Sequence, residues 1–93
     1  MPPMALHELH PLCDAEIAQL PEKPGVFVLF QIEVAVHADQ AANLRKALRT
    51  AKASFPSASH FSVETLAPRA LAPRVQQLRK QLRLVRTASF VGR

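Results

Sequence analysis

The stretch Pro24–Leu48, PGVFVLFQIEVAVHADQAANLRKAL, contains the segments that decide the fold. Val26–Phe30 is a continuous run of Val, Phe and Leu, which is typical of a strand covered on both faces. Ile32–His37 is rich in β-branched residues, so we expect it to pair with the first strand as a hairpin. The turn near Gln31 contains no Gly or Asn, the residues that tight hairpin turns favour, so the register of the hairpin stays open.

After Asp39 the apolar residues recur with the period of a helix instead of a strand. Asp39 is the expected N-cap of a helix that begins at Gln40, and Pro56 marks its end. The stripe that should pack on the sheet consists of Ala41, Leu44, Leu48, Ala51 and Phe55.

Three more elements complete the predicted order. Asp14 is placed to cap a short helix through Gln19, and His60–Leu66 alternates enough to predict a third strand. Pro73 suits the first turn of a final helix. Its apolar stripe contains Leu71, Val75, Leu78, Leu82 and Val85. The order α-β-β-α-β-α predicts an α+β fold, with a small three-stranded antiparallel sheet flanked by helices.

The length of 93 residues predicts one domain over the whole chain, with flexible tails at residues 1–12 and 87–93. No apolar run approaches the roughly 18 residues that span a membrane, and the first residues lack the pattern of a secretory signal. Cys13 is the only cysteine, which excludes an internal disulfide and fits a reducing compartment. We therefore expect a cytoplasmic protein that does not bind membranes.

Charge divides the chain into two unequal halves. Residues 1–40 carry six acids and one Lys, whereas residues 41–93 carry eleven Lys and Arg and one acid. Such asymmetry indicates a surface for a polyanion or an acidic partner, and it also occurs as a general feature of highly basic proteomes.

Two segments, LPEKPGVFVLF and VHADQAANLRKAL, resemble the amino-terminal half of a GIY-YIG nuclease domain, in particular that of the bacterial excision-repair endonuclease. The specific parts of the likeness are PGVF and QAANLRKAL, and it covers Leu20 to about Leu48. The resemblance implies a small antiparallel sheet flanked by helices, in agreement with the order read from the residues.

The resemblance also places the family's catalytic positions on this chain, where other residues stand. A tyrosine whose hydroxyl acts at the reacting water falls on Phe27, which has no hydroxyl. The second motif's tyrosine, glycine and lysine fall on His37, Asp39 and Gln40, and the helix arginine that stabilises phosphate charge falls on Ala47.

Neighbouring residues do not restore this chemistry. Arg45 and Arg49 are each two residues from Ala47, roughly 200° around a helix. The family's metal-binding glutamate belongs on the last helix, and Arg74–Arg86 contains no carboxylate. We therefore expect neither nuclease activity nor a metal or other cofactor.

Other candidate sites are weaker. His7, His10 and Cys13 have a spacing that could gather Zn²⁺, but Pro11 interrupts it and no fourth ligand follows, so we predict no metal site. Glu64, the only acid of the basic half, is expected to be a solvated surface residue.

Two hypotheses from different classes remain. The first is nucleic-acid binding through the backbone, without sequence preference, because the chain has no Trp or Tyr for a stacking platform. The second is a protein-interaction or oligomerisation module, in which the acidic and basic halves pair between chains. The residues expected to contact phosphates are Arg45, Arg49 and Lys52 on one helix and Arg79, Lys80, Arg83 and Arg86 on the other.

Overall fold

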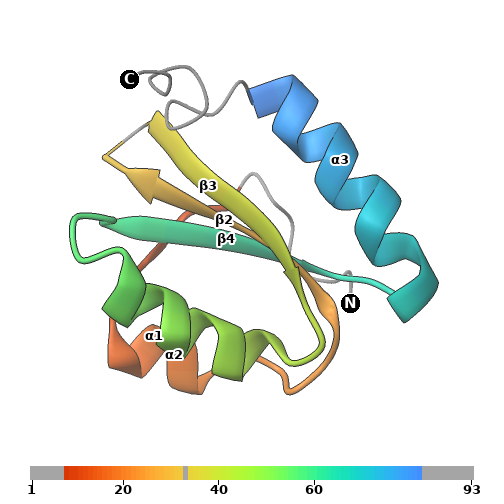
Figure 1. Cartoon of the computed structure of the whole chain (residues 1–93). Coiled ribbons are helices and arrows are strands. Elements are labelled where there is room, and N and C mark those ends of the chain that lie inside the picture. Colours follow the sequence, from red (N-terminus) through yellow and green to blue (C-terminus); the bar gives the residue numbers. More distant parts are fainter. Residues whose placement is uncertain (1–7, 33, 83–93) are drawn as a thin grey trace.

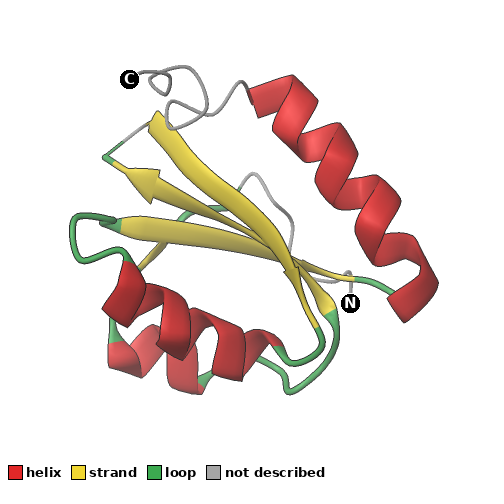
Figure 2. Cartoon of the chain, in the orientation of Figure 1, coloured by secondary structure: helices red, strands yellow, loops and turns green. Residues whose placement is uncertain are grey.

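The protein is described by a computed structural model that covers residues 8–32 and 34–82. Its centre is a four-stranded sheet with the strand order β1-β4-β2-β3. Helices cover both faces of this sheet (Figure 1; Figure 2). The predicted α+β class and antiparallel pairing are confirmed, and the predicted number of three strands is wrong.

β2 (Gly25–Gln31) is the central strand and pairs antiparallel with both β3 (Val34–Ala41) and β4 (His60–Thr65). The unexpected fourth strand is β1 (His10–Pro11), which pairs with the outer side of β4. Two residues of the expected flexible tail, residues 1–12, therefore form a strand of the sheet. A proline fits there because an edge strand needs fewer backbone donors. The other expected tail, residues 87–93, lies outside the described residues.

The two faces of the sheet carry two separate apolar cores. α1 (Asp14–Ala18) and α2 (Leu44–Ser54) pack on one face, where Phe27 and Leu29 point. α3 (Leu71–Leu82), preceded by the 3-10 turn η1 (Pro68–Ala70), packs on the other face against Val26 and Val28. The uninterrupted apolar run of β2 thus does reflect burial on both faces, as predicted.

The stripes of the two long helices follow the expected periodicity, except that Ala41, expected to begin the first stripe, is the last residue of β3. Leu44, Leu48 and Ala51 of α2 are buried. Leu71, Val75 and Leu78 of α3 are buried as well, and Pro73 occupies the first turn. Val85, the last predicted member of the α3 stripe, lies outside the described residues.

The predicted start of α2 is wrong. Asp39 is a residue of β3 paired with Phe27, and β3 continues to Ala41. The N-cap is Asn43, whose side chain accepts a hydrogen bond from the backbone N–H of Lys46. Asn and Asp cap helices about equally well, so the sheet pairing of Asp39 decided which residue took the role.

The predicted cap of α1 is also displaced by one residue. Cys13 occupies the N-cap position without a side-chain hydrogen bond, and Asp14 is the first helical residue. A carboxylate in the first turn still interacts favourably with the helix dipole. The α1 helix ends at Ala18, with Gln19 as its C-cap.

The β2–β3 hairpin closes between Gln31 and Val34. Ile32, in the turn, has a φ of 62°, a conformation that β-branched residues rarely adopt. Its N–H donates to the Ser59 hydroxyl at 2.7 Å, which holds the turn against the loop before β4. Ile32 is 71% exposed and Val34 is 48% exposed, so two apolar side chains are exposed at the tip of the hairpin.

Gly25 lies where β2, β4 and α2 approach most closely. A Cβ atom at this position would collide with the Glu64 carbonyl oxygen and lie 2.7 Å from Leu44 Cδ1. The same junction is held by backbone bonds from Leu44 N–H to the Lys23 carbonyl at 3.0 Å and from Leu66 N–H to the Pro24 carbonyl at 3.1 Å. The close packing of these three elements therefore leaves room only for a glycine at this position.

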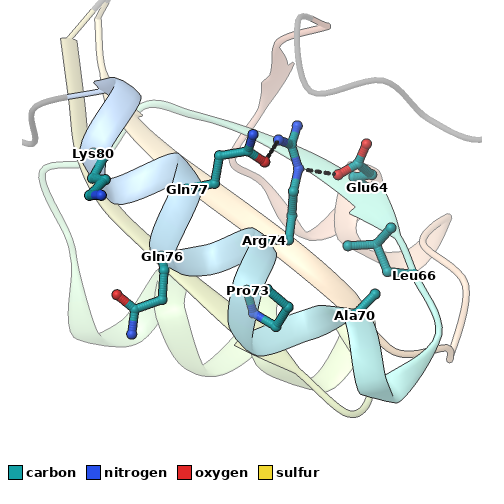
Figure 3. Close-up of a pocket in the computed structure, with 8 residues that line it drawn as sticks. All are labelled: Glu64, Leu66, Ala70, Pro73, Arg74, Gln76, Gln77 and Lys80. Carbon is teal, nitrogen blue, oxygen red and sulfur yellow. Dashed lines mark hydrogen bonds and ion pairs between the residues drawn. The ribbon is translucent and has the colours of Figure 1, made fainter.

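Glu64 connects β4 to α3, contrary to the solvated role expected from the sequence. Arg74 Nε donates to Glu64 Oε1 at 2.8 Å, and both side chains are about three-quarters buried (Figure 3). The same guanidinium donates from Nη1 to Gln77 Oε1 at 2.6 Å. These residues border a broad, open depression beside α3 that also includes Leu66 and Lys80.

None of the helices in the described part of the chain is long and apolar enough to cross a membrane.

We predict that Gly25→Ala destabilises the protein by about 3 kcal/mol, at the upper end of the usual cost of overpacking, because one collision partner is backbone that cannot rotate away. Chemical denaturation of the wild type and the variant measures this. A free energy of unfolding within about 0.5 kcal/mol of the wild type would contradict the close packing at this junction.

We also predict that Arg74→Ala lowers the free energy of unfolding by about 1 to 2 kcal/mol, because it leaves the Glu64 carboxylate partly buried without its donor. Lys80→Ala is the matched control on the exposed side of the same helix and should change stability by less than about 0.5 kcal/mol. Equal effects of the two substitutions would show that the ion pair is not structural.

Candidate functional site

A pocket of about 300 Å³ lies between β3 and α2 and brings together five positions to which the family resemblance assigns catalysis, whereas the position of the metal-binding glutamate, on the last helix, does not line it. The register pairs Phe27 with Asp39, and α2 crosses the same face of the sheet. The lining residues are Phe27, His37, Asp39, Gln40, Ala47, Thr50, Ala51, Ser54 and Phe55. The predicted positions therefore form one site, although they are spread over 21 sequence positions, from 27 to 47.

Four of the lining residues were not predicted from the sequence. Thr50, Ala51 and Ser54 follow Ala47 by three, four and seven positions, so a helix places them on one face. That spacing could have identified them once Ala47 was placed in the site. Phe55 is the C-cap residue of α2, and its position depends on where the helix ends.

Aromatic rings form one wall of the pocket. The His37 ring stacks on Phe55 with 4.6 Å between centroids and an angle of 28° between planes. Phe27 lies 6.0 Å from His37 in a tilted arrangement and is only 5% exposed. Phe27 thus belongs to the apolar core as well as to the pocket, and it presents carbon atoms where the family resemblance implies a hydroxyl.

Asp39 is held by groups from both sides of the sheet. Its Oδ1 accepts the backbone N–H of Gln40 at 2.8 Å and lies 3.6 Å from Arg79 Nη2. Its Oδ2 lies 3.9 Å from His37 Nε2. The carboxylate therefore has the Arg79 guanidinium beside one oxygen and the His37 ring beside the other.

Arg79 reaches Asp39 from α3, on the opposite face, by passing around the edge of β3. Its Nε and Nη2 donate to the Ala38 carbonyl at 3.2 and 3.1 Å. β3 is an edge strand, so its outward carbonyls have no strand partner. Arg79 supplies donors to one of them, which explains its position without any ligand.

The donor set at this pocket does not fit the Mg²⁺ that the fold family implies. Mg²⁺ requires carboxylate or other oxygen ligands, and among the described residues Asp39 is the only carboxylate that lines the pocket. α3 contains no acid, and Glu64 projects to the other face, where it pairs with Arg74. The described residues contain no group of three or more His, Cys, Asp and Glu that could hold a metal ion.

The amino-terminal His and Cys residues have other roles within the described part of the chain. His10 Nδ1 lies 3.6 Å from Glu16 Oε1, and its ring lies 5.5 Å from Phe61. Cys13 is half-buried at the start of α1. His7 lies outside the described residues.

Five of the seven residues predicted to contact phosphates are described, and these five do not form one continuous surface, because α2 and α3 lie on opposite faces of the sheet (Figure 1). Arg45 Nη1 lies 3.4 Å from Glu22, and its Nε donates to the Leu20 carbonyl. Lys52 Nζ lies 3.6 Å from Asp14. The structure thus joins the acids of the first half to bases of the second.

The remaining predicted residues fall into two groups. Arg49 of α2 and Lys80 of α3 are exposed, as is Lys46, which the sequence analysis did not include. Arg83 and Arg86 lie outside the described residues.

No protein-family model and no curated protein matches the sequence. Solved structures do match. The GIY-YIG N-terminal endonuclease domain of UvrC from Thermotoga maritima, bound to its catalytic magnesium, is 20% identical, with a TM-score of 0.66 over 75% of this chain and 89% of that chain. A variant of that domain with one tyrosine changed to phenylalanine, bound to the catalytic divalent cation, is 22% identical with the same TM-score and covers 75% and 88% of the two chains. The chain therefore has a GIY-YIG-like fold.

Proposed function

We propose that the protein is a non-catalytic GIY-YIG-like domain that binds the nucleic-acid backbone without sequence preference. The observation that carries this proposal is that Phe27, Asp39 and Ala47, to which the resemblance assigns the hydroxyl, the glycine and the arginine, line one pocket. The similar solved structures are endonuclease domains, so the fold has a known use on nucleic acid.

The proposed loss of catalysis follows from three positions. Phe27 has no hydroxyl to act on a water molecule, and Ala47 has no charge to stabilise a phosphate. Asp39 places a carboxylate where the phosphate would lie, and like charges repel. The described residues also contain no group of three or more His, Cys, Asp and Glu that could hold a metal ion, which supports the proposed loss of catalysis.

Backbone binding is supported by the exposed cations of the two long helices. Lys46 and Arg49 on α2 and Lys80 on α3 are exposed to solvent. The pairs of Arg45 with Glu22 and of Lys52 with Asp14 span 3.4 to 3.6 Å and involve exposed acids. Such pairs contribute about 0 to 1 kcal/mol, so a phosphate can compete for either cation.

A protein-interaction or oligomerisation module is the alternative, and one feature favours it. Ile32 and Val34 expose apolar side chains at the hairpin tip, and Ile32 adopts a strained backbone conformation. A strained, exposed, apolar residue is more often retained for a contact than for stability. This alternative becomes the leading interpretation if nucleic-acid binding is absent.

We predict no cleavage of supercoiled plasmid with Mg²⁺ or Mn²⁺. Loss of a single electrostatic group typically lowers the rate by about 10² to 10³, and here several are replaced. Phe27→Tyr alone should not restore cleavage, because Asp39 and Ala47 remain. Metal-dependent nicking that follows the protein through several purification steps would contradict the proposal that catalysis is lost.

We predict weak binding to duplex DNA with a strong salt dependence. Because the helices lie on opposite faces, one duplex should meet only one of them, and three to four phosphate contacts correspond to a log-log salt slope of roughly −3 to −4. Fluorescence anisotropy with a labelled duplex of arbitrary sequence, from about 50 to 200 mM salt, measures the slope.

Two double variants identify the helix that carries the contacts. Arg49→Ala with Lys52→Ala tests α2, and Lys80→Ala with Arg83→Ala tests Lys80 of α3 together with a basic residue that follows α3 in the sequence. The double variant on the binding helix should flatten the slope by about two units for all sequences alike, and the other should leave it unchanged. No retention of DNA or RNA at about 50 mM salt would exclude backbone binding.

A further inference from the structure

The pocket between β3 and α2 combines an aromatic wall with hydrogen-bonding groups. The stacked rings of His37 and Phe55, with Phe27 beside them, form the wall. Thr50 and Ser54 bring hydroxyl groups from α2, each of which can donate or accept. Such a site offers contacts to the face of a flat molecule and separate contacts to its edge.

The charges around the pocket disfavour an anion. Among the described residues, no Lys or Arg lines the pocket, and its one carboxylate is Asp39. Arg79 approaches Asp39 Oδ1 at 3.6 Å from the α3 side, so it offsets the charge without lining the pocket. Asp39 Oδ2, on the His37 side, retains capacity to accept an N–H donor.

We propose that this pocket binds a nucleobase with an exocyclic amine, stacked on the aromatic wall and donating to Asp39. A plain aromatic ring would leave the polar groups of the pocket without a partner. A base has both a π-face and an edge of donors and acceptors. Gln40 adds an amide, which can both donate to and accept from that edge.

The size of the pocket sets the number of bases. About 300 Å³ is at the lower end of the range for ligand pockets, which suits one base rather than a stack of several. A base paired in a duplex has its edge occupied and its faces stacked, so the ligand must be a free nucleoside or an unpaired base of a strand. Stacking on an aromatic side chain typically raises affinity by about 5- to 150-fold.

This inference goes beyond the backbone binding proposed above and does not depend on it. Backbone binding uses exposed cations on the outer surfaces of the helices, whereas base binding uses an uncharged wall on the inner side of α2. The two activities can therefore be separated by substitution and by salt.

The absence of Trp and Tyr gives a direct assay, because the protein itself is nearly dark when 2-aminopurine is excited. Stacking quenches 2-aminopurine fluorescence. The full-length protein is titrated into 2-aminopurine riboside, into a single strand with one internal 2-aminopurine, and into the same strand paired to its complement. We expect saturable quenching of the riboside or of the single strand, and none of the paired duplex.

Ala47→Leu fills the pocket from α2 and should weaken the quenching at least tenfold. Its matched control is Ala53→Leu, which makes the same change at an exposed position of α2 outside the pocket and should leave the quenching unchanged. Asp39→Asn keeps the shape of the side chain and removes its charge, so it should weaken binding about fivefold. This second variant keeps the test decisive if Ala47→Leu does not fold.

The three probes also identify the source of the base. Quenching of the riboside indicates a free nucleoside as a sufficient ligand, and quenching of the single strand alone indicates a base presented by a polynucleotide. No saturable quenching of either probe, or equal quenching in Ala47→Leu and Ala53→Leu, would overturn the inference. Salt-dependent duplex binding without quenching would overturn base binding and leave backbone binding intact. Riboside quenching without duplex binding would exclude backbone binding and leave base binding intact.

Discussion

The close approach of three elements at Gly25 is the constraint on which the rest of the structure depends. The position pairs with Ala41 of β3 on one side and with Thr65 of β4 on the other, and Leu44 of α2 packs above it. A side chain here would collide with the backbone of β4, so the central strand could not be sandwiched in this way. The junction also sets where α2 crosses the sheet, and hence the position of the pocket beneath it.

The pocket brings residues of β2, β3 and α2 to one place, because the three elements share an apolar core. In the proposed interpretation, Phe27, Ala47 and Asp39 replace the hydroxyl, the arginine and the glycine that the family resemblance implies. The described residues then give the site an aromatic wall and a single carboxylate. Function is decided by such side chains and not by the fold.

Folding also uses part of the charge asymmetry of the chain. Asp14 and Glu22, from the acidic half, lie beside Lys52 and Arg45 of α2. Arg79 spans the edge of β3 to reach the Ala38 carbonyl and Asp39. A count of charges along the sequence therefore overestimates the basic surface that is available to an external ligand, because several of the cations already lie beside carboxylates of the same chain.

The residues by themselves determined most of the fold. Burial on both faces of β2 produces an uninterrupted apolar run, and the stripes of α2 and α3 repeat with the helical period, so these elements can be recognised from neighbouring residues alone. The motif positions of the site could also be named, because the spacing of PGVF and QAANLRKAL was sufficient for the resemblance.

Only the tertiary structure decided the features that depend on residues far apart in the chain. β1 is two residues long and exists because β4 offers it an edge, and Asp39 is a strand residue rather than a cap because Phe27 pairs with it. The same holds for the pairing of Glu64 with Arg74 and for the placement of the two basic helices on opposite faces of the sheet. Local sequence patterns do not predict such contacts, because each segment taken alone is compatible with several local structures. Pairing in the assembled sheet selects one of them.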